Sequence, residues 1–169
     1  LYNRHKLHQV FTSEINRSNR FEEIFGIILL DIDLFKNVND TYGHNIGDLV
    51  LKEISNILKD NIRVSDTLGR WGGEEFLILL YQCEESMVEH IAQKIRLAFE
   101  KAPIQGSNGA SFYKTLSVGA SMFPKDSDSL WKCIKFADIA LYNAKENGRN
   151  CVKTFEQEMV EGKEMKSEF

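Results

Sequence analysis

The segment Phe-Gly-Ile-Ile-Leu-Leu-Asp-Ile-Asp at residues 25–33 constrains the fold more than any other part of the chain. Its apolar side chains fall on both alternating faces of an extended strand, so both faces need a covering layer. Such a segment is typical of the central strand of a sheet that has helices on each side. Its two acids, Asp31 and Asp33, come at the carboxyl end and are expected at the edge of the sheet.

The rest of the chain alternates between helical and strand patterns. Apolar residues recur every three or four positions in four segments, which predicts helices at about 6–19, 47–62, 84–99 and 129–147. Gly148 is expected to cap the last helix. Alternating or β-rich runs predict four more strands, at about 66–71, 75–81, 113–122 and 150–155.

This order predicts an α/β (α+β) fold with a central mixed five-stranded sheet surrounded by helices. Residues 1–155 are expected to form one domain, and residues 156–169 a charged C-terminal tail. The opening residues Leu1-Tyr-Asn-Arg4 look like the interior of a longer protein, so the N-terminal start is expected to be truncated.

Composition excludes several classes of function. With 169 residues and 43% apolar residues, the chain can bury one core. Its 21 Lys and Arg against 25 Asp and Glu argue against a nucleic-acid binder with a broad basic surface. The longest apolar runs are too short to span a bilayer, so no membrane contact by this domain is expected. Three well-separated cysteines suggest neither a zinc site nor disulfides, which favours the cytoplasm.

Acidic side chains gather at two predicted turns. Asp31 and Asp33 are two apart on a strand and are expected to point the same way. Glu74 and Glu75 follow Gly72-Gly73 in a predicted hairpin, where the glycines are expected to supply positive φ angles. Converging carboxylates suit Mg²⁺, although solvated acids at loop ends explain each residue about as well when it is read alone.

Other polar residues allow two interpretations each. Lys36 with free backbone N–H groups at the start of a turn or short helix would bind phosphate, or is a surface lysine. Asn39 favours a turn and Asp48 is expected in the first turn of a helix. Lys145 and Arg149 are expected near the end of the last helix, where cations are favoured anyway. No phosphate-binding P-loop, dinucleotide fingerprint or nucleophile elbow is present.

Together these motifs resemble the GGDEF (GGEEF) domain of diguanylate cyclases. The run Arg70-Trp-Gly-Gly-Glu-Glu-Phe76 looks like the family's hairpin, and Asp31-Ile-Asp-Leu-Phe-Lys36 is similar to its D-I-D-x-F-K. Residues 39–48 resemble its N-D-x-x-G-H-x-x-G-D motif. Segments 1–4 and 137–150 also match in order and spacing, so the resemblance covers roughly residues 1–153. It implies a fold like that of nucleotidyl cyclases and the polymerase palm.

The resemblance also implies an activity. Such a domain condenses two GTP into cyclic di-GMP plus two pyrophosphate, across a homodimer in which each domain holds one GTP. Mg²⁺ is the implied cofactor, with Mn²⁺ as an alternative, bound by Asp31, the carbonyl of Ile32 and Glu74. Glu74 matches the acceptor of the 3′-hydroxyl proton, and Lys36 matches a stabiliser of the transition state.

The remaining implied roles concern substrate and product. Asn39 and Asp48 match the guanine-recognising pair, since a carboxylate can accept from both donors of the guanine edge. The substrate-binding set is Phe35, Lys36, Asn39, Asp48, Gly72, Gly73, Lys145 and Arg149. Arg63 and Asp66, five residues ahead of the glycines, match an inhibitory site for the product. Lys94 is its expected third member, with Arg96 as the alternative.

The resemblance implies further partners and leaves alternatives. A sensory or regulatory domain is expected upstream in the full-length protein, which is compatible with a membrane anchor there. A domain that only senses GTP or cyclic di-GMP is disfavoured by the intact hairpin. A cyclase of mixed purine dinucleotides is disfavoured by Asp48, and a purely structural dimerisation domain leaves the polar residues unexplained.

Overall fold

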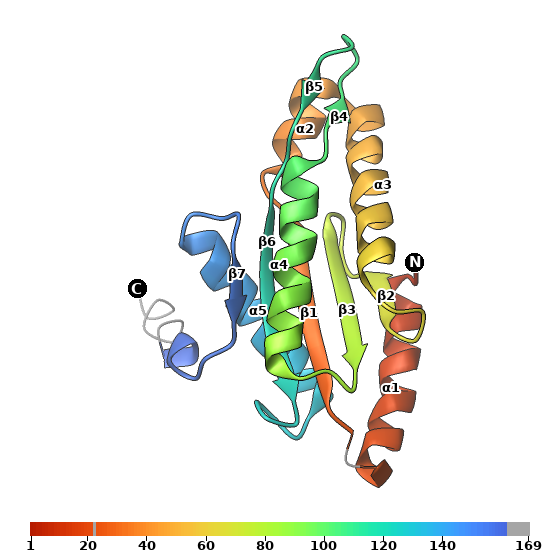
Figure 1. Ribbon diagram of the computed structural model, residues 1–169, viewed down its shortest axis with the longest axis vertical. Helices are drawn as coiled ribbons and strands as arrows, with labels where there is room; N and C mark the ends of the chain where they lie inside the picture. Colours follow the sequence, from red (N-terminus) through yellow and green to blue (C-terminus); the bar gives the residue numbers. More distant parts are fainter. Residues whose placement is uncertain (22, 162–169) are drawn as a thin grey trace.

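The computed structural model describes residues 1–21 and 23–161 and contains a five-stranded mixed sheet (Figure 1). Its strand order is β2-β3-β1-β6-β7. The central strand β1 pairs antiparallel with β3 and β6, and β6 pairs parallel with β7. The predicted mixed sheet, with the segment at 25–33 in its middle, is confirmed. The strands are β1 Phe25–Ile32, β2 Thr67–Arg70, β3 Glu75–Tyr81, β6 Leu116–Phe123 and β7 Val152–Thr154.

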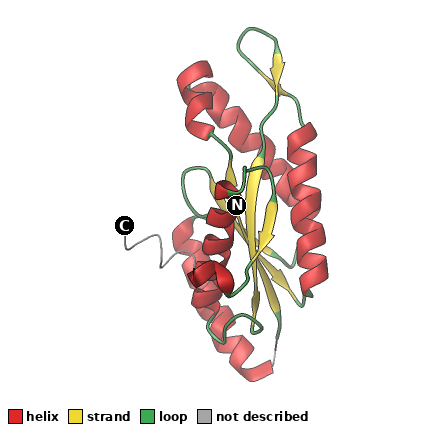
Figure 2. Cartoon of the chain, turned by 90° about the vertical axis from the view of Figure 1, so that its left-hand side faces the viewer, coloured by secondary structure: helices red, strands yellow, loops and turns green. Residues whose placement is uncertain are grey.

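Helices cover both faces of this sheet (Figure 2). Ile28, Leu30 and Ile32 of β1 belong to one core, packed under α2, α3 and α4. Phe25, Ile27 and Leu29 belong to the other core, with α1 and α5. The alternation along β1 therefore places its neighbours in two separate cores, as its apolar pattern requires. The helices are α1 Arg4–Phe21, α2 Phe35–Tyr42, α3 His44–Asn61, α4 Glu85–Lys101 and α5 Leu130–Glu146.

The region after β1 differs from the sequence prediction. The short helix expected near Lys36 is present as α2, eight residues long, whereas α3 begins at His44 instead of Gly47. Helix α2 buries only Phe35 and Val38, and two apolar positions are too few to show a helical period. Gly43, with φ 83°, separates the two helices.

A second, two-stranded sheet was also missed. Strands β4 Ile104–Gln105 and β5 Ser111–Phe112 form a hairpin around the predicted turn, at the top of Figure 1. Strands of two residues carry no periodic signal, so the sequence could not reveal them. The hairpin contacts α2 through a stack of Phe112 on Tyr42, whose ring centroids are 4.5 Å apart.

The described part of the predicted tail packs on α5. The rings of Phe136 and Phe155 stack 4.1 Å apart, and Met159 and Val160 lie partly buried in the same cluster. Residues 162–169 of the predicted tail lie outside the described residues, and the expected domain end at residue 155 stays a prediction. Within the described chain, no helix is long and apolar enough to cross a membrane.

Candidate active site

A cleft of about 500 Å³ lies between α2, α3 and the β2–β3 hairpin. It gathers six of the predicted site residues from three separate segments of the sequence. Three further lining residues were not singled out as site residues by sequence reasoning: His44, Leu51 and Arg70. His44 lies in the motif at residues 39–48 and Arg70 in the motif at residues 70–76, so these motifs could have identified both residues. The six predicted lining residues are Phe35, Lys36, Asn39, Asp48, Gly73 and Glu74.

The hairpin that carries Glu74 is closed by hydrogen bonds and not by left-handed glycines. The N–H groups of Trp71 and Gly72 both donate to the carbonyl of Glu75, at 2.8 and 3.2 Å. The Arg70 Nε donates to the Gly73 carbonyl at 2.9 Å. Neither Gly72 nor Gly73 has a φ in the left-handed region, so that expectation was wrong.

The glycines instead leave space. A Cβ on Gly73 would meet nothing within 4 Å, although the residue lines the cleft. A Cβ on Gly72 would come within 2.5 Å of Glu75 Oε2. Gly73 therefore exposes bare backbone to any ligand in the cleft, and Gly72 lets the Glu75 side chain fold beneath the turn.

Asp31 is buried, with 7% of its surface exposed, next to the cleft. Its Oδ2 accepts a hydrogen bond from Lys145 Nζ of α5, so Lys145 reaches a carboxylate in this structure. Its Oδ1 is buried and has no hydrogen-bond partner among the described residues. Burial raises the pKa of Asp31 to about 6; Lys145 opposes this shift, and Glu74 and Glu75 add to it.

This arrangement fits a divalent cation. The N–H of Ile32 donates to the carbonyl of Glu74 at 3.4 Å, which brings the backbones of both predicted ligand residues together beside Asp31. Within the described residues, no group of three or more His, Cys, Asp or Glu side chains forms a ready-made metal site. Two carboxylates and a carbonyl suit Mg²⁺, which usually completes its shell with water and substrate phosphates.

Asp33 lies just past the end of β1 and does not share the task of Asp31. Its Oδ1 accepts from the Ser117 hydroxyl at 2.5 Å, and its Oδ2 accepts from the Thr115 hydroxyl at 2.6 Å. The Asn150 N–H donates to the same Oδ2 at 3.1 Å. Asp33 therefore ties β6 and the turn after α5 to the end of β1, and its oxygens are occupied by these three donors.

The far end of the cleft is shaped by the packing of α2 on α3. A Cβ on Gly47 would lie 2.0 Å from Asn39 Oδ1, so the missing side chain leaves the space that the Asn39 amide occupies. Asp48 lies in the second turn of α3 and not in the first, because the helix begins at His44. Asn39 and Asp48 nevertheless line the same cleft, as predicted.

The groups expected to bind phosphate lie at two helix ends. Helix α2 begins after Leu34, which has φ 53° and provides no side-chain cap, so the first amides of α2, near Lys36, are not capped. At the end of α5, Gly148 (φ 99°) follows the helix, and the Arg149 N–H donates to the Ala144 carbonyl at 3.0 Å. Gly148 therefore caps α5 as predicted, and exposed Arg149 follows it.

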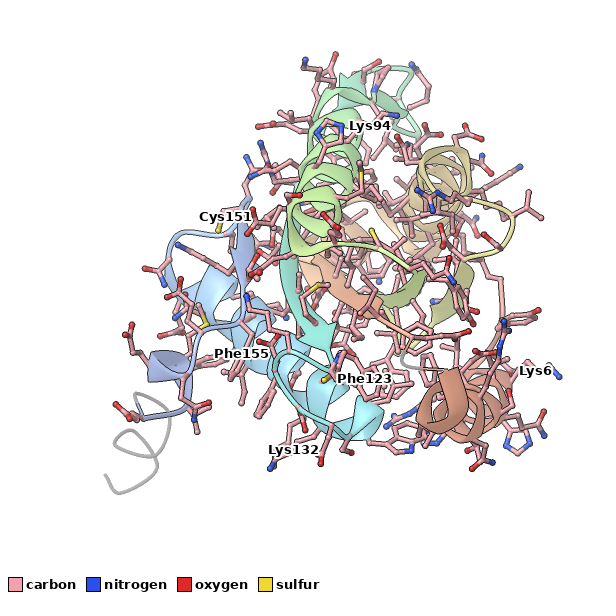
Figure 3. The ribbon with its side chains drawn as sticks, turned by 60° about the horizontal axis from the view of Figure 1, so that its bottom comes forward. Lys6, Lys94, Phe123, Lys132, Cys151 and Phe155 are labelled. Atoms are coloured by element: carbon pink, nitrogen blue, oxygen red, sulfur yellow. The ribbon has the colours of Figure 1, made fainter. Side chains whose placement is uncertain are left out.

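The predicted inhibitory residues form a turn outside the cleft. The Arg63 N–H donates to Asp66 Oδ2 at 2.8 Å, and the Tyr81 N–H donates to Asp66 Oδ1 at 3.2 Å. A hollow of about 410 Å³ lies beside this turn. Lys94 is exposed on α4 (Figure 3), whereas the alternative, Arg96, is bound to Glu100 at 3.0 Å.

Helix α1 supports the hairpin, a contact that the sequence did not suggest. His8 stacks on Trp71 at 5.7 Å between ring centroids and lies 4.6 Å from Trp131. The guanidinium of Arg4 lies 4.8 Å from the centre of the Trp71 ring. Tyr2 also pairs with the edge of β2, where its carbonyl accepts from the Arg70 N–H at 2.8 Å.

The fold and the cleft together define a class of protein. It is an α/β domain in which carboxylates, a lysine, amide groups and uncapped helix amides meet at the carboxyl end of the central strand. Such a set of groups suits a nucleoside triphosphate bound together with a divalent cation.

The sequence matches the family described as "Diguanylate cyclase, GGDEF domain" over residues 1–151. The chain therefore belongs to the GGDEF family of diguanylate cyclase domains. Diguanylate cyclase DosC of Escherichia coli (strain K12) is 40% identical over 153 residues, which are 90% of this chain and 33% of DosC. The chain thus spans about a third of the length of this curated relative.

Solved structures agree with this assignment. The active GGEEF domain of a diguanylate cyclase from Vibrio cholerae is 33% identical with a TM-score of 0.85, covering 93% of this chain and 99% of that one. The GGDEF domain of DgcB from Caulobacter crescentus, in complex with c-di-GMP, is 26% identical with a TM-score of 0.86. That match covers 91% of each chain.

Proposed function

We propose that this domain synthesises cyclic di-GMP from two GTP, releasing two pyrophosphate. The observation that carries the proposal is the buried Oδ1 of Asp31, which has no hydrogen-bond partner among the described residues and lies on the strand paired with the hairpin of Glu74. Glu74 lines a cleft together with Lys36 and the pair Asn39 and Asp48. The relatives named diguanylate cyclase support it. A buried carboxylate oxygen without a donor is costly unless a cation neutralises it, so the site favours a metal-bound nucleotide.

Each end of the cleft has its own task. Asp48 and Asn39 read the guanine edge, where the carboxylate accepts from both guanine donors. Lys36, the first amides of α2 after Phe35, and Arg149 hold the phosphates. Gly72 and Gly73 allow the close approach of the nucleotide.

The catalytic step belongs to Glu74 and Lys36. Glu74 accepts the proton of the 3′-hydroxyl, and Lys36 offsets the charge that develops on the phosphoryl group under attack. Mg²⁺, with Mn²⁺ as an alternative, held by Asp31, the Ile32 carbonyl and Glu74, would supply charge neutralisation of the phosphates and of the attacking oxygen. In this structure Lys145 forms an ion pair with Asp31. From this position beside the proposed metal site, its ammonium group can bind the phosphates of the nucleotide.

The partner in catalysis is a second copy of the domain. One cleft holds one nucleotide, and the reaction joins two, so two clefts must face each other. GTP as the substrate favours a cytoplasmic location, and the greater length of the curated relatives supports an upstream regulatory domain in the full-length protein. The product, cyclic di-GMP, would bind at Arg63, Asp66 and Lys94 and hold the two clefts apart.

The test is to incubate the protein with GTP and Mg²⁺ and to detect cyclic di-GMP by mass. A version fused to a dimerising helix is assayed in parallel, because catalysis needs two copies together. Product formation that stops when the metal is chelated is the expected result. GTP binding without product in the fused dimer would instead identify a domain that only senses the nucleotide.

A further inference from the structure

The turn after α5 has an unusual backbone. Arg149 and Asn150 both have positive φ, 62° and 46°, although neither is glycine. Side chains disfavour this region, and such residues persist only where their surroundings hold them there. Asparagine accepts this conformation more readily than arginine does. The energetic cost therefore falls mainly on Arg149, the residue placed on the phosphates above, and some other contact must hold it.

The contacts that hold this turn in place are made by Asn150. Its N–H donates to Asp33 Oδ2 at 3.1 Å, so its backbone is fixed to the end of β1. Its side chain reaches α4, where Oδ1 accepts from Arg96 Nη1 at 2.8 Å. Its Nδ2 donates to Glu100 Oε1, also at 2.8 Å. Cys151, the next residue, lies on the segment that runs beside α4 in Figure 3.

Arg96 and Glu100, the two residues of α4 that bind Asn150, are themselves held by further contacts. Arg96 Nη1 also bonds Glu100 Oε2 at 3.0 Å, and Arg96 Nε donates to Gln93 Oε1 at 2.9 Å. The amide of Asn150 and the charge of Arg96 lower the pKa of Glu100, which therefore stays a carboxylate. Hydrogen bonds to charged partners are stronger than neutral ones, so Asn150 has a firm anchor on α4.

We propose that Asn150 is a positioning residue that directs Arg149 toward the phosphates of the bound nucleotide, through its bridge to Arg96 and Glu100. This inference rests on the proposed function, because it takes Arg149 as a phosphate contact. Neighbouring elements do not need the bridge. The end of α5 is closed by the bond from the Arg149 N–H to Ala144, and the next residue is fixed by the bond from the Val118 N–H to Cys151.

The deciding experiment is a double-mutant cycle on GTP affinity, read by calorimetry, in the intact protein. Asn150→Gly keeps the positive φ and the N–H to Asp33, and removes only the bridge to α4. Arg149→Ala removes the side chain that the bridge is said to direct. Asn147→Ala is the matched control, because among the described residues its side-chain amide bonds only to Asn143 of α5, at 2.8 and 3.1 Å.

We expect Asn150→Gly to weaken GTP binding about five- to tenfold, the scale of one misplaced charge-assisted contact. In the Arg149→Ala background the same substitution should change the affinity less than twofold, since there is no side chain left to direct. Asn147→Ala should bind as the parent does. In an assay of cyclic di-GMP synthesis, Asn150→Gly should raise the KM for GTP and leave kcat nearly unchanged.

Two results would overturn the inference, and they are distinguishable. If Arg149→Ala binds GTP as tightly as the parent, Arg149 is no phosphate contact, and that part of the proposed function falls as well. If Arg149→Ala weakens binding but the effect of Asn150→Gly multiplies with it in full, Asn150 acts on its own or on the fold, and the positioning role is wrong.

Discussion

At the scale of single residues, hydrogen-bond donors decide what an acid does. Asp31 and Asp33 stand two apart and are both buried. Among the residues that the structure describes, Asp33 accepts from three donors, whereas one oxygen of Asp31 has no donor. The three contacts of Asp33 stabilise the fold, and the unpaired oxygen of Asp31 is the proposed metal ligand. The sequence alone does not show this difference, because the donors to Asp33 come from β6 and from the turn after α5, which only the fold brings to the end of β1.

Glu74→Gln should abolish cyclase activity and leave the melting temperature within a degree or two of the parent. The amide keeps the shape of the side chain but loses a charged metal ligand and the proposed proton acceptor. Product formation is measured by mass, and folding by thermal unfolding. A rate within a few-fold of the parent would remove Glu74 from both roles.

Asp33→Ala should act on stability. It leaves the hydroxyls of Thr115 and Ser117 and the N–H of Asn150 without their acceptor, a loss expected to cost about 2 to 4 kcal/mol of unfolding free energy. Urea denaturation measures this loss. Asp40→Ala, which removes an exposed acid from α2, is the control and should stay near the parent. Equal stability of both variants would contradict the structural role of Asp33.

At the scale of elements, the packing of α2 on α3 shapes the end of the cleft where guanine is proposed to bind. Gly47→Ala forces a Cβ to within 2.0 Å of Asn39 Oδ1, so Asn39 must move. We expect KM for GTP to rise about three- to tenfold, because the guanine edge loses a partner, and the preference for GTP over ATP to shrink.

Gly26→Ala is the matched control for this change. Its Cβ would lie 2.2 Å from Val88 Cγ2, a comparable clash at the opposite end of β1. Both variants should lose stability, and only Gly47→Ala should lose selectivity. If both variants keep the parent's preference for GTP over ATP, Asn39 does not read the base.

Elements also show what a sequence can predict. The long segments, such as β1, α4 and α5, were predicted because each repeats its apolar pattern several times. The full length of helix α2 and the β4–β5 hairpin were not predicted, since α2 buries only two apolar residues and each strand of the hairpin has two residues, too few to repeat a pattern. The motifs indicated which residues share the cleft, but not the hydrogen bonds of Asp33, which join residues more than 80 positions apart.

At the scale of the whole molecule, regulation should separate from catalysis. Arg63 lies outside the cleft, and its guanidinium can donate two hydrogen bonds at once to phosphate or to guanine. Arg63→Ala should therefore lose inhibition by cyclic di-GMP, with an uninhibited rate like that of the parent. Titration of the product against both proteins measures this. Lys52→Ala, an exposed lysine on α3, is the control, and equal inhibition of all three would remove the inhibitory site.

The contact of α1 with the hairpin has an optical consequence. The chain has two tryptophans, Trp71 and Trp131, and both rings lie against His8 of α1. The tryptophan fluorescence of the protein therefore originates at one place, the junction between the first helix and the hairpin that carries Glu74. An upstream domain that pulls on α1, or a nucleotide that displaces the hairpin, would change the emission without any added label.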